Sequence, residues 1–144
     1  MAIPEFYEWL DHVARRTGAL VNFEDLAGYT YQIPQLALRA NQIVHDGPYC
    51  RFAKNHGGLQ ACRDNKKRAV AEALRRGGAY EGLCFRGVWD CVHPVFYRGE
   101  AIGVFFLGGF LENAELTPVD GARFAGPSLP RISDARKKEL RGYA

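Results

Sequence analysis

The chain has 144 residues, 47% of them hydrophobic and 24% charged, which is typical of one globular domain around one core. Its formal net charge of +3 is too small to indicate nucleic-acid binding. No apolar run reaches the roughly 18 residues of a membrane span, and the N-terminus lacks the pattern of a secretory signal. We therefore expect a cytoplasmic protein that contacts neither nucleic acid nor membrane.

The first predicted element is an amphipathic helix over Pro4–Thr17, which starts with a proline and stops at Gly18. Its apolar face is a candidate dimer interface or signalling element, although a face packed on its own sheet would look the same in sequence. That face consists of Phe6, Trp9, Leu10 and Val13. A short strand over Ala19–Asn22 follows, and turn-like chemistry from Phe23 to Gly28 closes it.

Helical periodicity is clearest over Gln60–Arg76, which ends at Gly77-Gly78. One side of this helix carries an apolar stripe, and we interpret the basic residues on its other sides as solvated. The stripe consists of Cys62, Ala69, Val70, Ala73 and Leu74. A shorter helix over Tyr49–Asn55, ending at Gly57-Gly58, is predicted before it, whereas Tyr29–Asp46 has no readable pattern.

Three strands are predicted next, over Ala79–Phe85, Trp89–Tyr97 and Ala101–Phe110. Arg98-Gly99 is suited to a tight hairpin turn between the last two. Because Pro94 has no N–H to donate, the middle strand is either interrupted or has that position turned away from a partner.

From Leu116 onward the sequence is typical of a loop, until Ser133-Asp134 opens a charged helix through Leu140 with almost no apolar face. We interpret this stretch as a linker helix that leads to an output module beyond Ala144. The resulting division is an N-terminal helix over residues 1–18, a central domain over residues 19–115, and a linker over residues 116–144.

Four cysteines lie within 42 residues, at Cys50, Cys62, Cys84 and Cys91. They lack the close pairs with which zinc sites usually begin. If the strand faces that carry Cys84 and Cys91 oppose the strong helix, three or four sulfurs converge. Three readings stay open: small buried hydrophobes, a zinc or iron–sulfur site, or a reversible dithiol.

The central region is rich in aromatic residues, which line small-molecule cavities together with a few polar groups. The alternative is a core filled by aromatic side chains. No spacing indicates a catalytic triad, paired carboxylates or a cysteine nucleophile with its base, so we do not expect an enzyme. The candidate ligand-binding residues are Tyr49, Phe52, Tyr80, Trp89, Asp90 and His93.

Several short motifs taken together resemble the PocR-type sensory domain over about Ala19 to Leu111. They are Asp46-Gly47-Pro48-Tyr49-Cys50-Arg51, Cys62 at a helix start, Tyr80 to Cys84, Gly87-Val88-Trp89-Asp90, Val92-His93-Pro94-Val95, and Ile102-Gly103-Val104 through Gly108-Gly109. The family pattern carries cysteines that match Cys50, Cys62 and Cys84. This chain departs from it at Cys91, which is an additional cysteine, and at Gly109, where the family commonly has glutamine.

The resemblance implies an α+β, PAS-like fold, in which helices flank an antiparallel sheet. It also implies a sensory role in bacterial regulators, with binding of small organic molecules such as short diols and control of an attached transcription or signalling module. We expect a homodimer. We also expect Asp90 to accept a hydrogen bond from a hydroxyl group of the ligand. The alternative function is a metal, iron–sulfur or redox sensor built on the cysteines.

Overall fold

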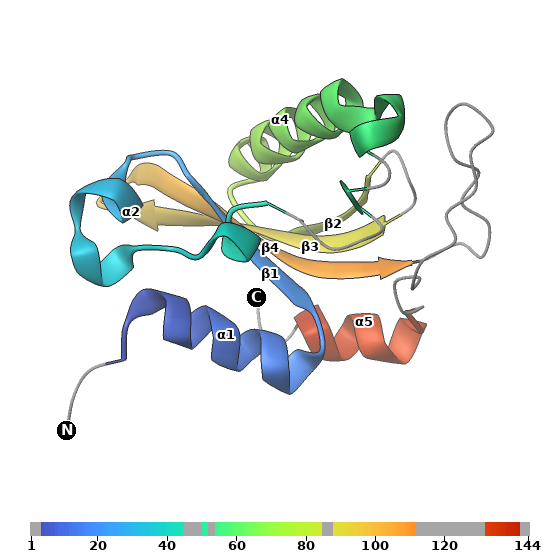
Figure 1. Ribbon diagram of the computed structural model, residues 1–144, viewed down its shortest axis with the longest axis horizontal. Helices are drawn as coiled ribbons and strands as arrows, with labels where there is room; N and C mark the ends of the chain where they lie inside the picture. The colour runs from blue at the N-terminus through green and yellow to red at the C-terminus, as the bar shows by residue number, and fades with distance from the viewer. Residues whose placement is uncertain (1–3, 45–49, 52–53, 85–87, 112–131, 142–144) are drawn as a thin grey trace.

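A four-stranded antiparallel sheet in the order β1-β4-β3-β2 forms the centre of the molecule. The computed structural model describes residues 4–44, 50–51, 54–84, 88–111 and 132–141. One long helix, α4, covers one face of the sheet, whereas α1 and α5 cover the other (Figure 1). The predicted α+β, PAS-like class is confirmed. The loop predicted over residues 116–132 lies outside the described residues, except for Ile132.

Helix α1 spans Phe6–Thr17. A capping box between Glu5 and Glu8 begins it, and Gly18 ends it in the left-handed conformation at φ 69°. Leu10 is buried, and Phe6 and Val13 pack against the same core. The apolar face is therefore largely used within the chain. Trp9 differs, because it is 56% exposed.

Strand β1 covers Leu20–Asp25, so the turn predicted from Phe23 is wrong: Phe23 is buried in the core and continues the strand. The chain turns after Asp25, whose carboxylate accepts hydrogen bonds from the backbone N–H groups of Ala27, Gly28 and Thr30. The unreadable stretch that follows consists of short helical turns. They are α2 (Tyr29–Gln32), η1 (Pro34–Leu36) and η2 (Ala40–Gln42).

Helix α4 spans Leu59–Arg76 and ends at Gly77, as predicted. The π-helical turn η3 (Lys54–Gly58) leads straight into it. Four residues of the predicted helix over Tyr49–Asn55 are described, and all four are helical: Cys50 and Arg51, and Lys54 and Asn55 in η3. Within the predicted stripe, Ala73 is buried, whereas Leu74 is exposed.

The remaining strands are β2 (Tyr80–Leu83), β3 (Val88–Tyr97) and β4 (Glu100–Leu111). Both turn residues between β3 and β4 have positive φ, 50° at Arg98 and 80° at Gly99, as a tight two-residue hairpin requires. Strand β3 is not interrupted at Pro94. Strand β2 begins at Tyr80, which lies opposite Val92. Pro94 lies two residues beyond that point on β3, where β2 is no longer alongside, so its missing N–H costs no hydrogen bond to β2.

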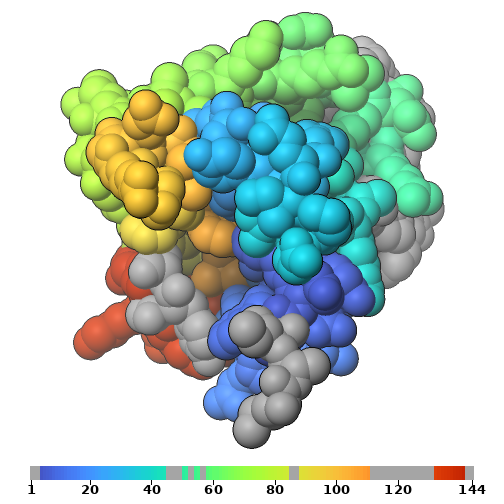
Figure 2. All heavy atoms as spheres, turned by 90° about the vertical axis from the view of Figure 1, so that its left-hand side faces the viewer, coloured from blue at the N-terminus to red at the C-terminus, as the bar shows by residue number. Residues whose placement is uncertain are grey.

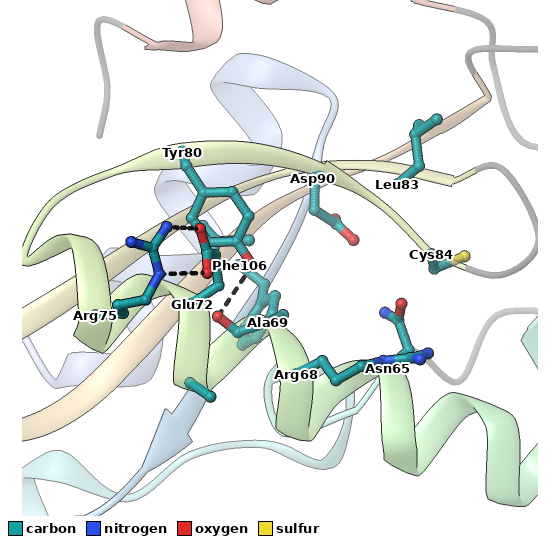
Figure 3. Close-up of a pocket in the computed structure, with 13 residues that line it drawn as sticks. Asn65, Arg68, Ala69, Glu72, Arg75, Tyr80, Leu83, Cys84, Asp90 and Phe106 are labelled. Carbon is teal, nitrogen blue, oxygen red and sulfur yellow. Dashed lines mark hydrogen bonds and ion pairs between the residues drawn. The ribbon is translucent and has the colours of Figure 1, made fainter.

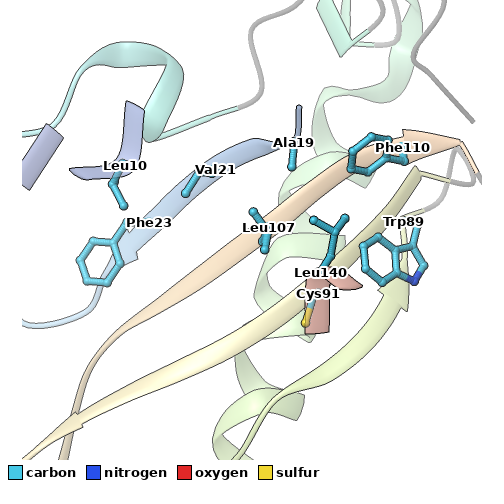
Figure 4. Packing of buried hydrophobic residues seen from close by; sticks show 9 residues of the cluster. All are labelled: Leu10, Ala19, Val21, Phe23, Trp89, Cys91, Leu107, Phe110 and Leu140. Carbon is cyan, nitrogen blue, oxygen red and sulfur yellow. The ribbon is translucent and has the colours of Figure 1, made fainter. Parts of the chain in front are cut away.

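Alternation along the strands gives the sheet two different faces. The face toward α1 and α5 holds the larger core (Figure 4), which comprises Leu10, Ala19, Val21, Phe23, Trp89, Cys91, Leu107, Phe110 and Leu140. The face toward α4 holds a smaller core of Ala73, Val92, Val104 and Phe106. Figure 2 shows the same stacking from the end, with α4 above the sheet and α1 and α5 below it.

Helix α5 spans Asp134–Arg141 and is more than a charged linker. Leu140 is 0% exposed and Lys137 is 7% exposed. Arg141 forms an ion pair with Glu81 of β2, and Arg136 donates a hydrogen bond to the carbonyl of Thr17 at the end of α1. The helix has almost no apolar face, as predicted, but the single leucine is enough to seat this short helix on the core.

Candidate functional site

A cleft of about 490 Å³ lies between α4 and the sheet face beneath it (Figure 3). One wall comes from α4 and the other from β2, β3 and β4. The lining residues are Asn65, Arg68, Ala69, Ala71, Glu72, Arg75, Tyr80, Gly82, Leu83, Cys84, Asp90, Val92 and Phe106. Its volume lies within the range of small-molecule sites, roughly 300–1,000 Å³.

The helical wall follows from the spacing of residues along α4. Positions three and four apart share one side of a helix, so Asn65, Arg68, Ala69 and Glu72 face the cleft together. The neighbouring positions Ala69 and Ala73 pack against Val92, Val104 and Phe106. Alanine is small enough to let the helix approach the sheet closely, while the longer polar side chains border the open part.

Asp90 lies on the sheet wall and points toward α4 (Figure 3). Its Oδ1 accepts a hydrogen bond from the backbone N–H of Gly109 at 3.1 Å. The β3–β4 register shifts between Trp89 and Asp90, which pair with Phe110 and Gly108, so Gly109 is an extra residue in β4. The carboxylate therefore holds this β-bulge in place, and two carboxylate oxygens can accept more than one hydrogen bond.

Both glycines at the bulge are required by its geometry. A Cβ atom on Gly108 would overlap the carbonyl oxygen of Trp89, and Gly109 has φ 80°, with Leu20 2.6 Å from its would-be Cβ. A larger residue at position 109 would be strained. This explains why the pair is Gly-Gly in this chain.

Tyr80 closes one end of the cleft. Its hydroxyl donates a hydrogen bond to the carbonyl of Ala69 at 3.0 Å, and the Arg76 guanidinium lies 4.9 Å from the ring centroid. Burial raises the pKa of the phenol, and the nearby Glu72 carboxylate acts in the same direction. Tyr80 therefore stays neutral at physiological pH and joins β2 to α4.

Glu72 is paired along its own helix. Hydrogen bonds from Arg75, and then from Arg76, lower its pKa to about 2. The ion pairs with Arg75 and Arg76 measure 2.5 and 2.6 Å between nitrogen and oxygen. The Glu72 carboxylate is thus engaged by two arginines and is not a free acceptor for a ligand.

Three of the four cysteines influence one another. The pKa of Cys50 is raised to about 12, first by burial and then by the charges of Cys84, Cys62 and Asp90, whereas Lys54 opposes the shift. Cys84 itself lines the cleft. Cys91 lies on the opposite face, packed in the core with Leu140 (Figure 4), because successive side chains of β3 point to opposite sides. The fourth sulfur does not join the others.

Among the described residues, no group of three or more His, Cys, Asp or Glu side chains is arranged to hold a metal ion. The zinc or iron–sulfur site at the cysteines therefore stays a prediction without support from the geometry.

The structure brings together only part of the predicted ligand site. Tyr80 and Asp90 line the cleft. Trp89 is on the other face, where its Nε1–H donates to Glu81 at 3.0 Å. His93 shares that face, and its buried Nδ1 has no hydrogen-bond partner among the described residues. The other two predicted residues, Tyr49 and Phe52, lie outside the described part of the chain.

The sequence reasoning missed the helical wall, chiefly Asn65, Arg68 and Glu72. The signal was the spacing of three and four residues between these polar side chains, which places them on one side of α4. It was hidden because Arg68 belongs to a run of basic residues that looks uniformly solvated. Only the position of the sheet shows which of these side chains border a cleft.

A family model described as the sensory domain found in PocR matches residues 3–128. The chain belongs to the PocR sensory-domain family. The match extends beyond the stretch from Ala19 to Leu111 in both directions and includes α1 and the whole cleft. Neither curated proteins nor solved structures yield a match.

Helix α5 lies beyond the residues that match the PocR sensory domain, although it packs into the same core. Within the described part of the PocR domain and α5, no helix is long and apolar enough to cross a membrane.

Proposed function

We propose that this PocR domain binds a small organic molecule in the cleft between α4 and the sheet. The observation that carries the proposal is the placement of Asp90, a carboxylate on the wall of a cleft whose sheet side is otherwise mainly apolar. Val92 and Phe106 offer apolar surface for a carbon chain, and Asp90 offers an acceptor for a ligand hydroxyl. A few polar groups in an apolar pocket are the usual means of fixing a ligand's orientation.

We propose binding and not catalysis. Burial and neighbouring charges raise the pKa of Cys50 to about 12, so its thiol is protonated at neutral pH and is a poor nucleophile.

The bound molecule would regulate an attached output module through β3 and α5. Asp90 lies on one face of β3, and its neighbour Trp89 is connected on the other face through Glu81 to Arg141 of α5. A ligand that prefers one position of the bulge therefore biases the position of Trp89 and the docking of α5. Such a ligand shifts the population of two arrangements by its difference in affinity for them.

The test is thermal unfolding of the chain with a panel of short hydroxylated compounds, diols and hydroxycarboxylates among them, which donate hydroxyl hydrogens. A compound that binds the folded state stabilises it, by about 2.7 kcal/mol at a concentration of one hundred times its Kd. The unfolding midpoint therefore rises. Asp90→Asn keeps an acceptor oxygen for Gly109 but removes the charge, and we expect it to reduce the shift. Glu100→Gln, a matched exposed carboxylate at the hairpin, should leave the shift unchanged.

Two results would overturn the proposal. One is an unchanged midpoint for the unmodified chain with every compound at saturating concentration. The other is a ligand-induced shift that persists in full in Asp90→Asn, because the ligand would then bind elsewhere.

A further inference from the structure

Two polar side chains on the α4 wall of the cleft have no partner within the described residues. Asn65 and Arg68 line the cleft, yet neither forms a hydrogen bond or an ion pair there. Their neighbours along the helix differ, since Glu72 pairs with Arg75 and Arg76, and Lys66 pairs with Glu24 at 2.8 Å. The cleft therefore presents a guanidinium and an amide whose donors are available.

These donors lie across the cleft from the carboxylate of Asp90. In Figure 3, Asp90 projects from β3 toward the helix, and Asn65 and Arg68 lie on the helical wall near Cys84. A molecule between the two walls meets donors, one of them positively charged, on one side and a negatively charged acceptor on the other. Val92 and Phe106 form an apolar surface on the sheet side.

We propose that the ligand is a short hydroxycarboxylate. Its carboxylate accepts hydrogen bonds from Arg68 and Asn65, its hydroxyl donates to Asp90, and its carbon chain lies against Val92 and Phe106. This inference rests on the proposed function and specifies the chemical class of the ligand. Arginine suits this role because its planar guanidinium can bind a carboxylate through two parallel hydrogen bonds.

Other small molecules fit the two walls less well. A diol leaves the Arg68 charge unpaired, and a dicarboxylate brings a second negative charge against Asp90. An amino acid would place an ammonium group, which has three donors, beside Asp90. Val92 and Phe106 supply no acceptors there, whereas the Tyr80 hydroxyl, whose proton goes to the Ala69 carbonyl, keeps an oxygen that can accept one hydrogen bond. A hydroxyl has only one proton to donate, and Asp90 alone satisfies it.

The experiment is calorimetric titration of the chain with hydroxycarboxylates from glycolate to hydroxyhexanoate that carry the hydroxyl at the far end. Each is compared with the diol and the simple carboxylate of the same carbon number. We expect one hydroxycarboxylate to bind at least about tenfold more tightly than its two analogues. Its affinity should fall as salt is added, whereas diol affinity should not, since salt screens the pairing with Arg68.

Arg68→Gln is the decisive variant. Arg68 is exposed and unpartnered within the described residues, so its replacement should leave the unfolding midpoint of the free chain unchanged. It should weaken hydroxycarboxylate binding about tenfold or more and leave diol binding unaltered. Arg63→Gln is the matched control, because it removes the same charge from an exposed position of α4 outside the cleft, and it should change neither affinity.

The outcomes separate this inference from the proposed function. If diols bind as tightly as hydroxycarboxylates, or if Arg68→Gln weakens neither, the carboxylate assignment is overturned and the small-molecule site stands. If the amino acid that carries an ammonium group in place of the terminal hydroxyl binds more tightly than the hydroxycarboxylate, the hydroxyl assignment is overturned. If no compound of any class binds, the proposed function fails together with the inference.

Discussion

The two faces of the sheet are built from the same strands but do different things. The face toward α1 and α5 is closed: Trp89, Cys91 and Leu107 are buried with Leu10 and Leu140. On the face toward α4, a small core gives way to a cleft with an apolar sheet side and a polar helical wall. Residues adjacent in sequence, such as Trp89 and Asp90, thus serve different purposes. One strand stabilises the domain with one set of side chains and presents the other set to the cleft in which we propose that a ligand binds.

Side-chain size explains much of the difference. The closed face is filled by aromatic rings, with Phe6, Phe23 and Phe105 in mutual contact at centroid distances of 4.8 to 6.1 Å. Helix α4 meets the other face largely through Ala69 and Ala73. These small side chains leave space between the helix and the sheet next to their contact. That space is the cleft, and long polar side chains of α4 border it.

The largest effect is expected at the closed face. Leu140→Ala removes a fully buried side chain and should lower the free energy of unfolding by about 2–5 kcal/mol, from lost burial and the cavity left behind. Urea denaturation measures it, with Leu59→Ala as the exposed leucine control. Equal small losses in both variants would show that α5 does not belong to the core.

A smaller loss of stability is expected at the β-bulge between β3 and β4. In Gly108→Ala, the new methyl group would lie too close to the Trp89 carbonyl, and we expect a loss of about 1–3 kcal/mol in urea denaturation. Gly78→Ala is the control, since nothing lies within 4 Å of its would-be Cβ, and it should be neutral or slightly stabilising. A neutral Gly108→Ala would contradict the close approach of β3 and β4.

The smallest effect is expected at the ion pair that joins α5 to β2. Hydrogen bonding from Arg141, opposed by burial, lowers the pKa of Glu81 below its ordinary value of 4.5. Stabilisation by a carboxylate with a lowered pKa is complete above the unfolded value and is lost as pH falls through the folded value. Glu81→Gln should therefore cost about 0.5–1 kcal/mol at pH 7, a small amount because the pair is partly exposed.

Unfolding of Glu81→Gln and of the unmodified chain over a pH series provides the measurement. The difference between them should be constant above about pH 5 and shrink as the pH falls below 4.5, because the unfolded chain takes up the proton first and the folded chain follows at its lowered pKa. A difference that stays the same in acid would mean that the Glu81 charge does not hold α5. The amide oxygen of the substituted glutamine still offers an acceptor to Trp89, so the indole hydrogen bond is not the variable.

The local parts of the fold could be predicted because their signals are local. The helix over Gln60–Arg76 shows helical periodicity and a glycine stop, and Arg98-Gly99 suits a two-residue turn. The bulge at Gly109 could not be predicted, because it depends on which residue of β3 lies opposite. The burial of Leu140 was also missed, since a single leucine makes no visible apolar stripe.

The amino-acid sequence by itself determined the order of the main helices and strands and the family. It also indicated two residues of the cleft, Tyr80 and Asp90. Hydrophobic periodicity and turn chemistry act between neighbours in the chain, so they are visible without a structure. Which face of β3 meets α4 became known only from the packed fold. That choice places Asp90 in the cleft with Arg68 and turns Trp89, Cys91 and His93 away, because pairing and packing between distant segments determine which alternate side chains share a surface.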